Sequence, residues 1–176
     1  TLILARELNL KFPEKNFIPI LWLHTEDHDI PEVDHIELFA KNIKWDHTQT
    51  GSAGDLRLTG IDRVLVEVEK LLGTEVFGPT ILDLLRKHYK EESDLYTATF
   101  GFVNELFGKY GLLVLDPRAK ELKETFKEVI RKEILNHPTE QILQKTNDEL
   151  EKSGYAVSVN PREINLFYLS EGKRDR

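Results

Sequence analysis

The sequence predicts an α/β fold, with a partial doubly wound, mainly parallel sheet and helices on both of its faces. Three observations lead to this prediction. Two short segments, Phe17–Leu23 and Leu112–Leu115, contain only apolar residues, as strands buried on both faces do. Apolar residues at helical spacing occupy much of the chain around them. Helix and strand patterns therefore alternate along the 176 residues, without an internal repeat.

The N-terminal part is predicted to contain one helix and three strands. Leucines at helical spacing precede Pro13, which ends this first helix. The apolar strand Phe17–Leu23 follows, and a run of polar residues separates it from the next one. His35–Ala40 is predicted as the second strand and Ile43–Asp46 as a short third strand.

Three amphipathic helices are predicted in the middle of the chain. Apolar residues recur at helical spacing over Ile61–Leu72, and Gly73 stands where a helix commonly ends. A second helix begins at Pro79, because proline is favoured in the first turn. The third helix covers Leu95–Tyr110 and ends at Gly111.

The last part of the chain starts with the strand Leu112–Leu115. Asp116 and Pro117 follow it and form a favourable N-cap and first-turn pair for the next helix, which carries Leu122 to Ile134. The remaining predicted elements are a helix from Pro138 to Gly154, strands at Tyr155–Val159 and Ile164–Leu169, and a hairpin turn over Ser170–Lys173.

In this prediction, the elements at both ends of the chain are incomplete. The first helix has no N-cap, and the hairpin turn before Arg176 has no returning strand, which would leave an apolar edge unpaired. We therefore expect residues 1–176 to form a single α/β domain that is a core segment of a longer chain. The absence of methionine is also compatible with an altered sequence.

The composition excludes several classes of function. With 31 acidic and 24 basic residues the net charge is −7, which disfavours nucleic acid or an anionic membrane as the main partner. The absence of cysteine excludes disulfides, thiolate catalysis, iron–sulfur clusters and cysteine zinc sites. The longest uncharged stretch, Asn16–Thr25, is too short to span a membrane, and no signal-peptide pattern is present. We expect a cytoplasmic protein.

The most unusual stretch follows the first strand and reads His-Thr-Glu-Asp-His-Asp from His24. In open α/β sheets, ligands bind beyond the carboxyl ends of the strands, so this is the expected place for a site. Carboxylates beside an imidazole can orient it or raise its basicity, and a neutral histidine can take a proton from an attacking amine. The alternative interpretation is a solvated acidic turn with one or two caps. The candidate catalytic residues are Glu26, Asp27, His28 and Asp29.

Five further residues are candidates for substrate binding. Gly51 and Gly54 could let the backbone approach a phosphate, although their polar loop lacks the strand-to-helix context and lysine of known phosphate loops. Asp116 follows a strand and could face a ligand or act as an N-cap. Asn165 is an amide on an apolar strand, where a buried amide needs a partner. His35 lies at the end of the acidic stretch.

A permanent metal site is not predicted. Glu26, Asp27 and Asp29 could hold Mg²⁺, and the histidines nearby could hold Zn²⁺. Their spacing, however, matches no standard ligand motif.

Several segments of the sequence are similar to segments of a known family, and they occur in the same order. Pro19-Ile-Leu-Trp-Leu is followed by Glu26-Asp-His-Asp and Glu32-Val-Asp-His, and this arrangement closely resembles a family signature. The helix and strand of Val103–Asp116 and the segment Pro161–Leu169 are similar to later family segments, and Gln49–Gly54 resembles a Bacteroidetes-like branch. The family is BshC, the cysteine ligases of bacillithiol biosynthesis.

This resemblance implies a Rossmann-like core and a carbon–nitrogen ligase that joins cysteine to the amine of glucosaminyl-malate. It also implies a longer chain that forms homodimers through a C-terminal coiled coil, which this sequence lacks. The cofactor is not identified by the resemblance, but activation of a carboxyl group would naturally use ATP with Mg²⁺. His24 stands where family members usually have a small residue.

Within this resemblance we interpret His28 as a base or as the residue that orients the reacting groups. Glu26, Asp27 and Asp29 would orient it or bind an ammonium group or Mg²⁺. Two other functions stay open at this point. One is a metal-dependent hydrolase or phosphoesterase that uses the same acidic cluster, and the other is a non-catalytic fragment or engineered α/β module.

Overall fold

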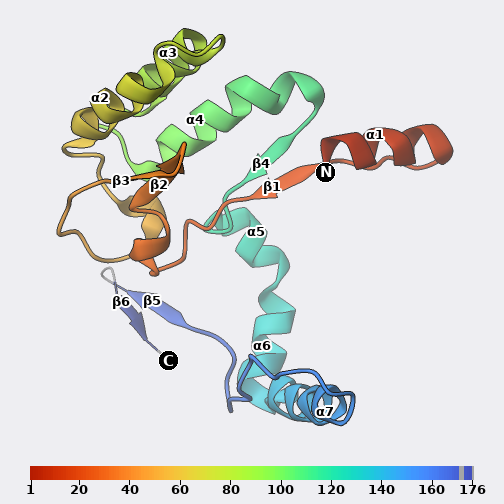
Figure 1. The fold of residues 1–176 in the computed structure, drawn as a ribbon. Helices are drawn as coiled ribbons and strands as arrows, with labels where there is room; N and C mark the ends of the chain where they lie inside the picture. The colour runs from red at the N-terminus through yellow and green to blue at the C-terminus, as the bar shows by residue number, and fades with distance from the viewer. Residues whose placement is uncertain (171–172, 176) are drawn as a thin grey trace. The chain divides into compact units, whose positions relative to one another are not determined.

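The structure is a computed structural model that describes residues 1–170 and 173–175 (Figure 1). The chain divides into two compact units, Thr1–Pro117 and Arg118–Arg176. The α/β class is confirmed, because the chain combines α-helices with a parallel pair of strands. That residues 1–176 act as a single domain stays a prediction.

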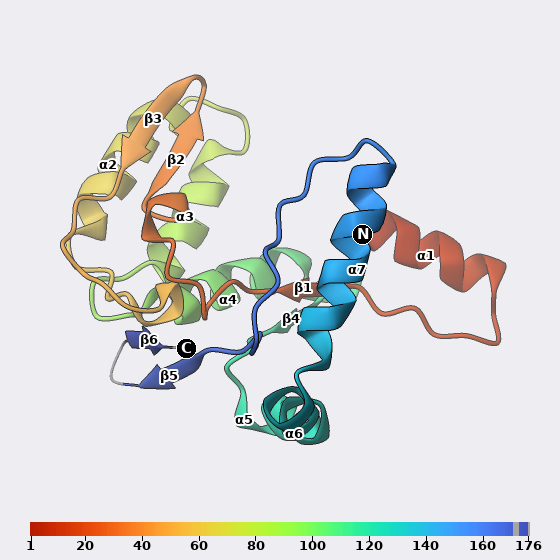
Figure 2. The ribbon, with the colours of Figure 1, turned by 90° about the horizontal axis from the view of Figure 1, so that it is seen from below.

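The first unit begins with α1 (Leu2–Lys11), which ends before Pro13 as predicted. Strands β1 (Ile20–Trp22) and β4 (Leu113–Leu115) pair in parallel and lie side by side in Figures 1 and 2. Beyond β1, the N–H of Leu23 donates to the carbonyl of Leu115 at 3.0 Å. The parallel sheet is therefore smaller than predicted, since each apolar run contributes only three residues to its strand.

One face of this small sheet is exposed. The side chains of Ile20, Trp22 and Leu113 are 49%, 57% and 54% exposed. The prediction that Phe17–Leu23 is buried on both faces is therefore wrong. Successive strand residues point to opposite faces, and within the first unit α4 packs against β4, which leaves the other face open.

Strands β2 (His35–Leu38) and β3 (Lys41–Lys44) form an antiparallel hairpin. Both were predicted, but β3 begins two residues earlier than the predicted strand Ile43–Asp46. The reason is the two-residue turn, in which Phe39 and Ala40 adopt positive φ angles of 49° and 61°. Such a turn fixes the register of a hairpin.

The three predicted central helices are confirmed as α2 (Ile61–Leu72), α3 (Gly78–His88) and α4 (Leu95–Phe107). A single 3₁₀ turn extends α4 to Tyr110, and Gly111 follows with a positive φ of 84°. These helices and the hairpin enclose two clusters of buried apolar residues. The first contains Trp45, Leu56, Leu58, Ile61 and Ala98, and the second contains Ile43, Val68 and Leu82.

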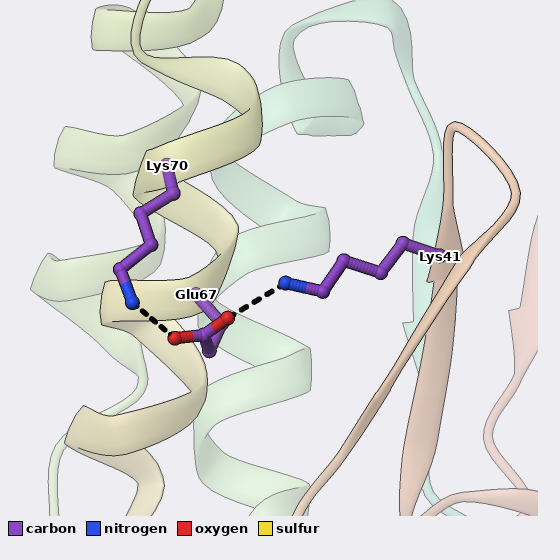
Figure 3. Close-up of polar contacts among 3 residues, drawn as sticks. All are labelled: Lys41, Glu67 and Lys70. Carbon is purple, nitrogen blue, oxygen red and sulfur yellow. Dashed lines mark hydrogen bonds and ion pairs between the residues drawn. The ribbon is translucent and has the colours of Figure 1, made fainter.

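An ion-pair triplet ties the hairpin to α2 (Figure 3). Glu67 on α2 accepts a hydrogen bond from Lys41 on β3 at 2.7 Å and another from Lys70 on its own helix. These two lysines lower the pKa of Glu67 to about 2.

The described part of the second unit contains three helices and an antiparallel pair of short strands. One long helix was predicted after Asp116-Pro117, but the structure has two helices, and the first does not begin until Lys120, after Ala119. The prediction that Asp116 is an N-cap is therefore wrong. The elements are α5 (Lys120–Thr125), α6 (Lys127–Asn136), α7 (Pro138–Lys152), β5 (Tyr168–Ser170) and β6 (Lys173–Asp175).

The predicted strand Tyr155–Val159 is absent from the structure. Its backbone bonds to α7 instead of to a neighbouring strand. The buried amide of Asn147 donates to the carbonyl of Val159 at 2.8 Å, and the N–H of Tyr155 donates to the carbonyl of Leu150 at 3.0 Å. These two bonds engage the backbone at both ends of the predicted strand.

The last predicted strand is shorter than expected and does have a partner. β5 begins only at Tyr168, so Asn165 is not on a strand. β6 pairs antiparallel with β5, with Tyr168 opposite Asp175, which corrects the expectation of a missing return strand. Part of the predicted turn, residues 171 and 172, lies outside the described residues. None of the described helices is long and apolar enough to cross a membrane.

Candidate active site

The carboxyl ends of β1 and β4 meet at one edge of the parallel sheet. Thr25 follows β1 and Asp116 follows β4 directly. The hydroxyl of Thr25 donates a hydrogen bond to Oδ1 of Asp116 at 2.5 Å. Thr25 is only 5% exposed and Asp116 is half-buried, so this bond is partly shielded from solvent. At the edge where the sequence predicts a site, a partly buried hydroxyl–carboxylate hydrogen bond therefore joins the two strand ends.

A third segment joins this edge through its backbone. The N–H of Gly54 donates to the carbonyl of Thr25 at 3.0 Å, and the N–H of Ala53 donates to the carbonyl of Asp27 at 2.7 Å. Gly51 turns the loop with a positive φ of 114°. Because these two N–H groups already have carbonyl partners, they are not available to a phosphate. The loop with Gly51 and Gly54 thus holds the acidic stretch in place.

His28 has a defined tautomer in this arrangement. Its Nδ1 lies 3.0 Å from the carbonyl oxygen of Glu26. A carbonyl oxygen can only accept a hydrogen bond, so Nδ1 carries the hydrogen and Nε2 of the neutral ring is unprotonated. The side chain is half-buried. Its geometry therefore suits a base that accepts a proton at Nε2.

The carboxylates next to His28 differ in their surroundings. Oδ1 of Asp27 accepts hydrogen bonds from the N–H of His28 at 2.8 Å and, more weakly, from the N–H of Asp29 at 3.3 Å. Asp27 thus stabilises the turn that carries His28. This role agrees in part with the alternative interpretation of the stretch as an acidic turn with one or two caps. Asp29 is exposed and stands at the start of a 3₁₀ turn, Ile30–Glu32, without a side-chain cap.

His35 takes part in a different cluster. The buried carboxylate of Asp34 accepts a hydrogen bond from Nδ1 of His35 at 3.1 Å and pairs with Lys44 at 3.4 Å. Burial raises the pKa of Asp34, but the hydrogen bonds from His35 and Lys44 outweigh it and leave that pKa below its ordinary value. These contacts stabilise the β2–β3 hairpin. They do not join His35 to the hydrogen bonds around Thr25.

Asn165 belongs to the second unit and is exposed, so the expectation of a buried amide on a strand is wrong. Its backbone N–H donates to Oε1 of the buried Glu133 at 3.0 Å. Oε2 of the same carboxylate accepts a bond from the hydroxyl of Thr139 at 2.5 Å. Asn165 thus helps to hold the second unit together through its backbone.

Sequence reasoning missed Thr25, although it stands within the acidic stretch. The available signal was one uncharged hydroxyl residue, two positions after the apolar run Phe17–Leu23, among residues that are otherwise ionisable. For metal binding, no group of three or more histidine, aspartate or glutamate side chains is arranged to hold an ion in residues 1–170 and 173–175.

Comparison with known proteins identifies the family. A model described as "Bacillithiol biosynthesis BshC, N-terminal Rossmann-like domain" matches residues 1–176. The chain belongs to the BshC family. The Rossmann-like core that the resemblance implied is therefore confirmed.

Two BshC relatives illustrate the similarity, and both carry the name "Putative cysteine ligase BshC". The protein of Cytophaga hutchinsonii is 35% identical over 98% of this chain and 31% of its own length. That of Christiangramia forsetii is 37% identical over the whole chain and 34% of its own length. The chain therefore spans about a third of the length of the curated BshC relatives it matches.

Proposed function

We propose that the protein carrying this chain is a ligase that joins the carboxyl group of cysteine to the amine of glucosaminyl-malate. The name of the relatives supports a cysteine ligase, and the description of the family model supports a role in bacillithiol biosynthesis. Homodimers formed through a coiled coil and a cytoplasmic location stay predictions from the sequence.

One observation supports placing the chemistry at the strand ends. Three segments that are far apart in sequence, around Thr25, Gly54 and Asp116, are bonded to each other at the edge of the parallel sheet. His28 lies next to this network, and Nε2 is the nitrogen without a hydrogen in its neutral form. An amine that attacks an acyl group must lose a proton, and a neutral imidazole is suited to accept it.

The reaction needs an activated carboxyl group, and we propose ATP with Mg²⁺ as the activating agent. The cysteine carboxylate would attack either the γ-phosphorus, giving an acyl phosphate and ADP, or the α-phosphorus, giving an acyl adenylate and pyrophosphate. The amine would then form the new C–N bond as the C–O bond to phosphate or AMP breaks. Nε2 of His28 would take the proton that the amine releases, and Glu26 and Asp29 would bind the ammonium group or Mg²⁺.

The test uses the complete protein with cysteine, glucosaminyl-malate and ATP, and it measures the ligated product by mass spectrometry. His28→Asn is the informative variant, because its side-chain amide can still donate to the carbonyl of Glu26 but offers no base. We expect its kcat to fall by about 10²–10⁴-fold. A matched control is His88→Gln in α3, since His88 pairs with Glu105 outside the site.

Two results would contradict the proposal. Absence of the ligated product with the unmodified protein would reject the reaction itself. Full activity of His28→Asn would reject the role of His28 as base. The same assay also separates the proposal from a non-catalytic module, which would form no product.

A further inference from the structure

A small cavity adjoins the candidate active site within the first unit. Its volume is about 110 Å³, and its wall includes Thr25 and Gly54, the residues that join the strand ends to the loop. Helix α4 supplies the opposite wall with Leu95 and Thr99. The cavity is therefore lined by the same edge of the sheet and by α4.

The size of the cavity limits what can enter it. A water molecule occupies roughly 30 Å³ in the liquid, so a volume of about 110 Å³ holds about three to four non-hydrogen atoms. A short side chain fits this space. An aromatic ring or a long charged side chain is larger than this volume.

The wall of the cavity is apolar in character. Leu23, Val33 and Leu95 contribute hydrocarbon surface. The two threonine hydroxyls of the wall already have protein partners, because that of Thr25 donates to Asp116 and that of Thr99 lies 3.2 Å from the hydroxyl of Tyr89. His24 and Tyr96 also line the cavity, but most of the surface that faces it is apolar. A polar group that entered would exchange water for mostly apolar neighbours, and such an exchange is costly.

We infer that this cavity receives the short apolar side chain of the amino-acid substrate, which is the –CH₂–SH group of cysteine if the proposed function holds. A thiol behaves as a small hydrophobic group and is only a weak hydrogen-bond donor. It therefore loses little on entering this wall. The hydroxyl of serine has nearly the same size but would lose its hydrogen bonds with water.

The inference is tested in the complete protein by comparing amino acids at saturating glucosaminyl-malate and ATP. The probes are cysteine, 2-aminobutyrate, serine, norvaline and phenylalanine. Because 2-aminobutyrate replaces the thiol with a methyl group, it separates the fit of the side chain from thiol chemistry. We expect kcat/KM for 2-aminobutyrate to exceed that for serine by at least about tenfold, and phenylalanine not to react.

Two variants change the cavity in opposite directions. Val33→Ala removes two methyl groups from the wall of the cavity. It should raise the ratio of kcat/KM for norvaline to kcat/KM for 2-aminobutyrate by about tenfold, because one methylene group in an apolar pocket has an effect of this size. Ala53→Val adds two methyl groups and should raise the KM for cysteine. Val66→Ala is the matched control, because Val66 is an exposed residue of α2 away from the cavity.

The outcomes separate this inference from the proposed function on which it rests. Equal use of serine and 2-aminobutyrate, or the same selectivity in Val33→Ala and Val66→Ala, would overturn the cavity assignment while leaving the ligase intact. If no amino acid yields product, the proposed function fails. In that case, calorimetry measures the binding of 2-aminobutyrate and serine to the same variants. This measurement decides whether the cavity selects short apolar side chains even without a reaction. Circular dichroism of each variant establishes that it is folded.

Discussion

The hydrogen bond between Thr25 and Asp116 predicts a specific loss of stability in Thr25→Val. This substitution keeps the size and branching of the side chain and replaces only the hydroxyl by a methyl group. Oδ1 of Asp116 then loses the donor that now lies 2.5 Å away. Since Thr25 is buried and Asp116 is half-buried, water replaces that donor only in part. The affected feature is the connection between the carboxyl ends of β1 and β4.

The magnitude follows from the charge of the acceptor. A hydrogen bond to a charged group contributes about 1.5–3 kcal/mol to the free energy of unfolding. Thr25→Ser keeps the hydroxyl and loses one methyl group, which costs about 1 kcal/mol or less. We therefore expect Thr25→Val to be less stable than Thr25→Ser, with a Tm that is several degrees below that of the unmodified protein.

Two measurements on the complete protein check this prediction. Urea unfolding followed by circular dichroism gives the overall loss of stability. Hydrogen exchange of the Leu23 amide, which donates to the carbonyl of Leu115, reports on the strand pair itself. Faster exchange in Thr25→Val than in Thr25→Ser is the expected result. Equal stability and equal exchange of the two variants would refute the reasoning, because the hydroxyl would then contribute nothing.

Two further predictions concern the fold of the first unit. The pKa of Glu67 is lowered to about 2 from an ordinary value of 4.5, so its contribution to stability is fully present above pH 4.5 and is lost as the pH falls toward 2. Glu67→Gln should flatten this part of the stability–pH profile in urea unfolding, and an unchanged profile would contradict the ion-pair triplet. Leu58→Ala should cost about 2–5 kcal/mol of unfolding free energy, because Leu58 is 0% exposed. Leu10→Ala, at a site that is 77% exposed, should cost far less in the same measurement.

Elements defined by local spacing could be predicted from the sequence. The apolar residues of Ile61–Leu72 repeat with the period of a helix, and the structure has α2 over the same residues. Gly111 ends its helical segment as predicted, because a positive φ costs glycine little. The strand-end position of the Glu26–Asp29 stretch also followed from the sequence, since a continuous apolar run precedes it.

Features that depend on distant partners could not be predicted in this way. An aspartate before a proline has the same local signature whether it caps a helix or binds a threonine far away, as Asp116 does. The alternation of Tyr155, Val157 and Val159 is likewise compatible with a strand or with a segment bonded to a helix. The bonds that Asn147 and Leu150 of α7 make to this segment decide between the two.

The contact between Thr25 and Asp116 also bears on the order in which the chain folds. The two residues are 91 positions apart, and closing a flexible loop of that length costs about 4 kcal/mol in entropy, from the logarithmic dependence on length. The β2–β3 hairpin and the helices α2 and α3 close over much shorter distances and can form during synthesis before Asp116 has emerged. The edge of the sheet that holds His28 is therefore completed late. A nascent chain that has not reached Asp116 contains the whole Glu-Asp-His-Asp sequence and the loop bonded to it, but it lacks the hydrogen bond that joins this segment to the end of β4.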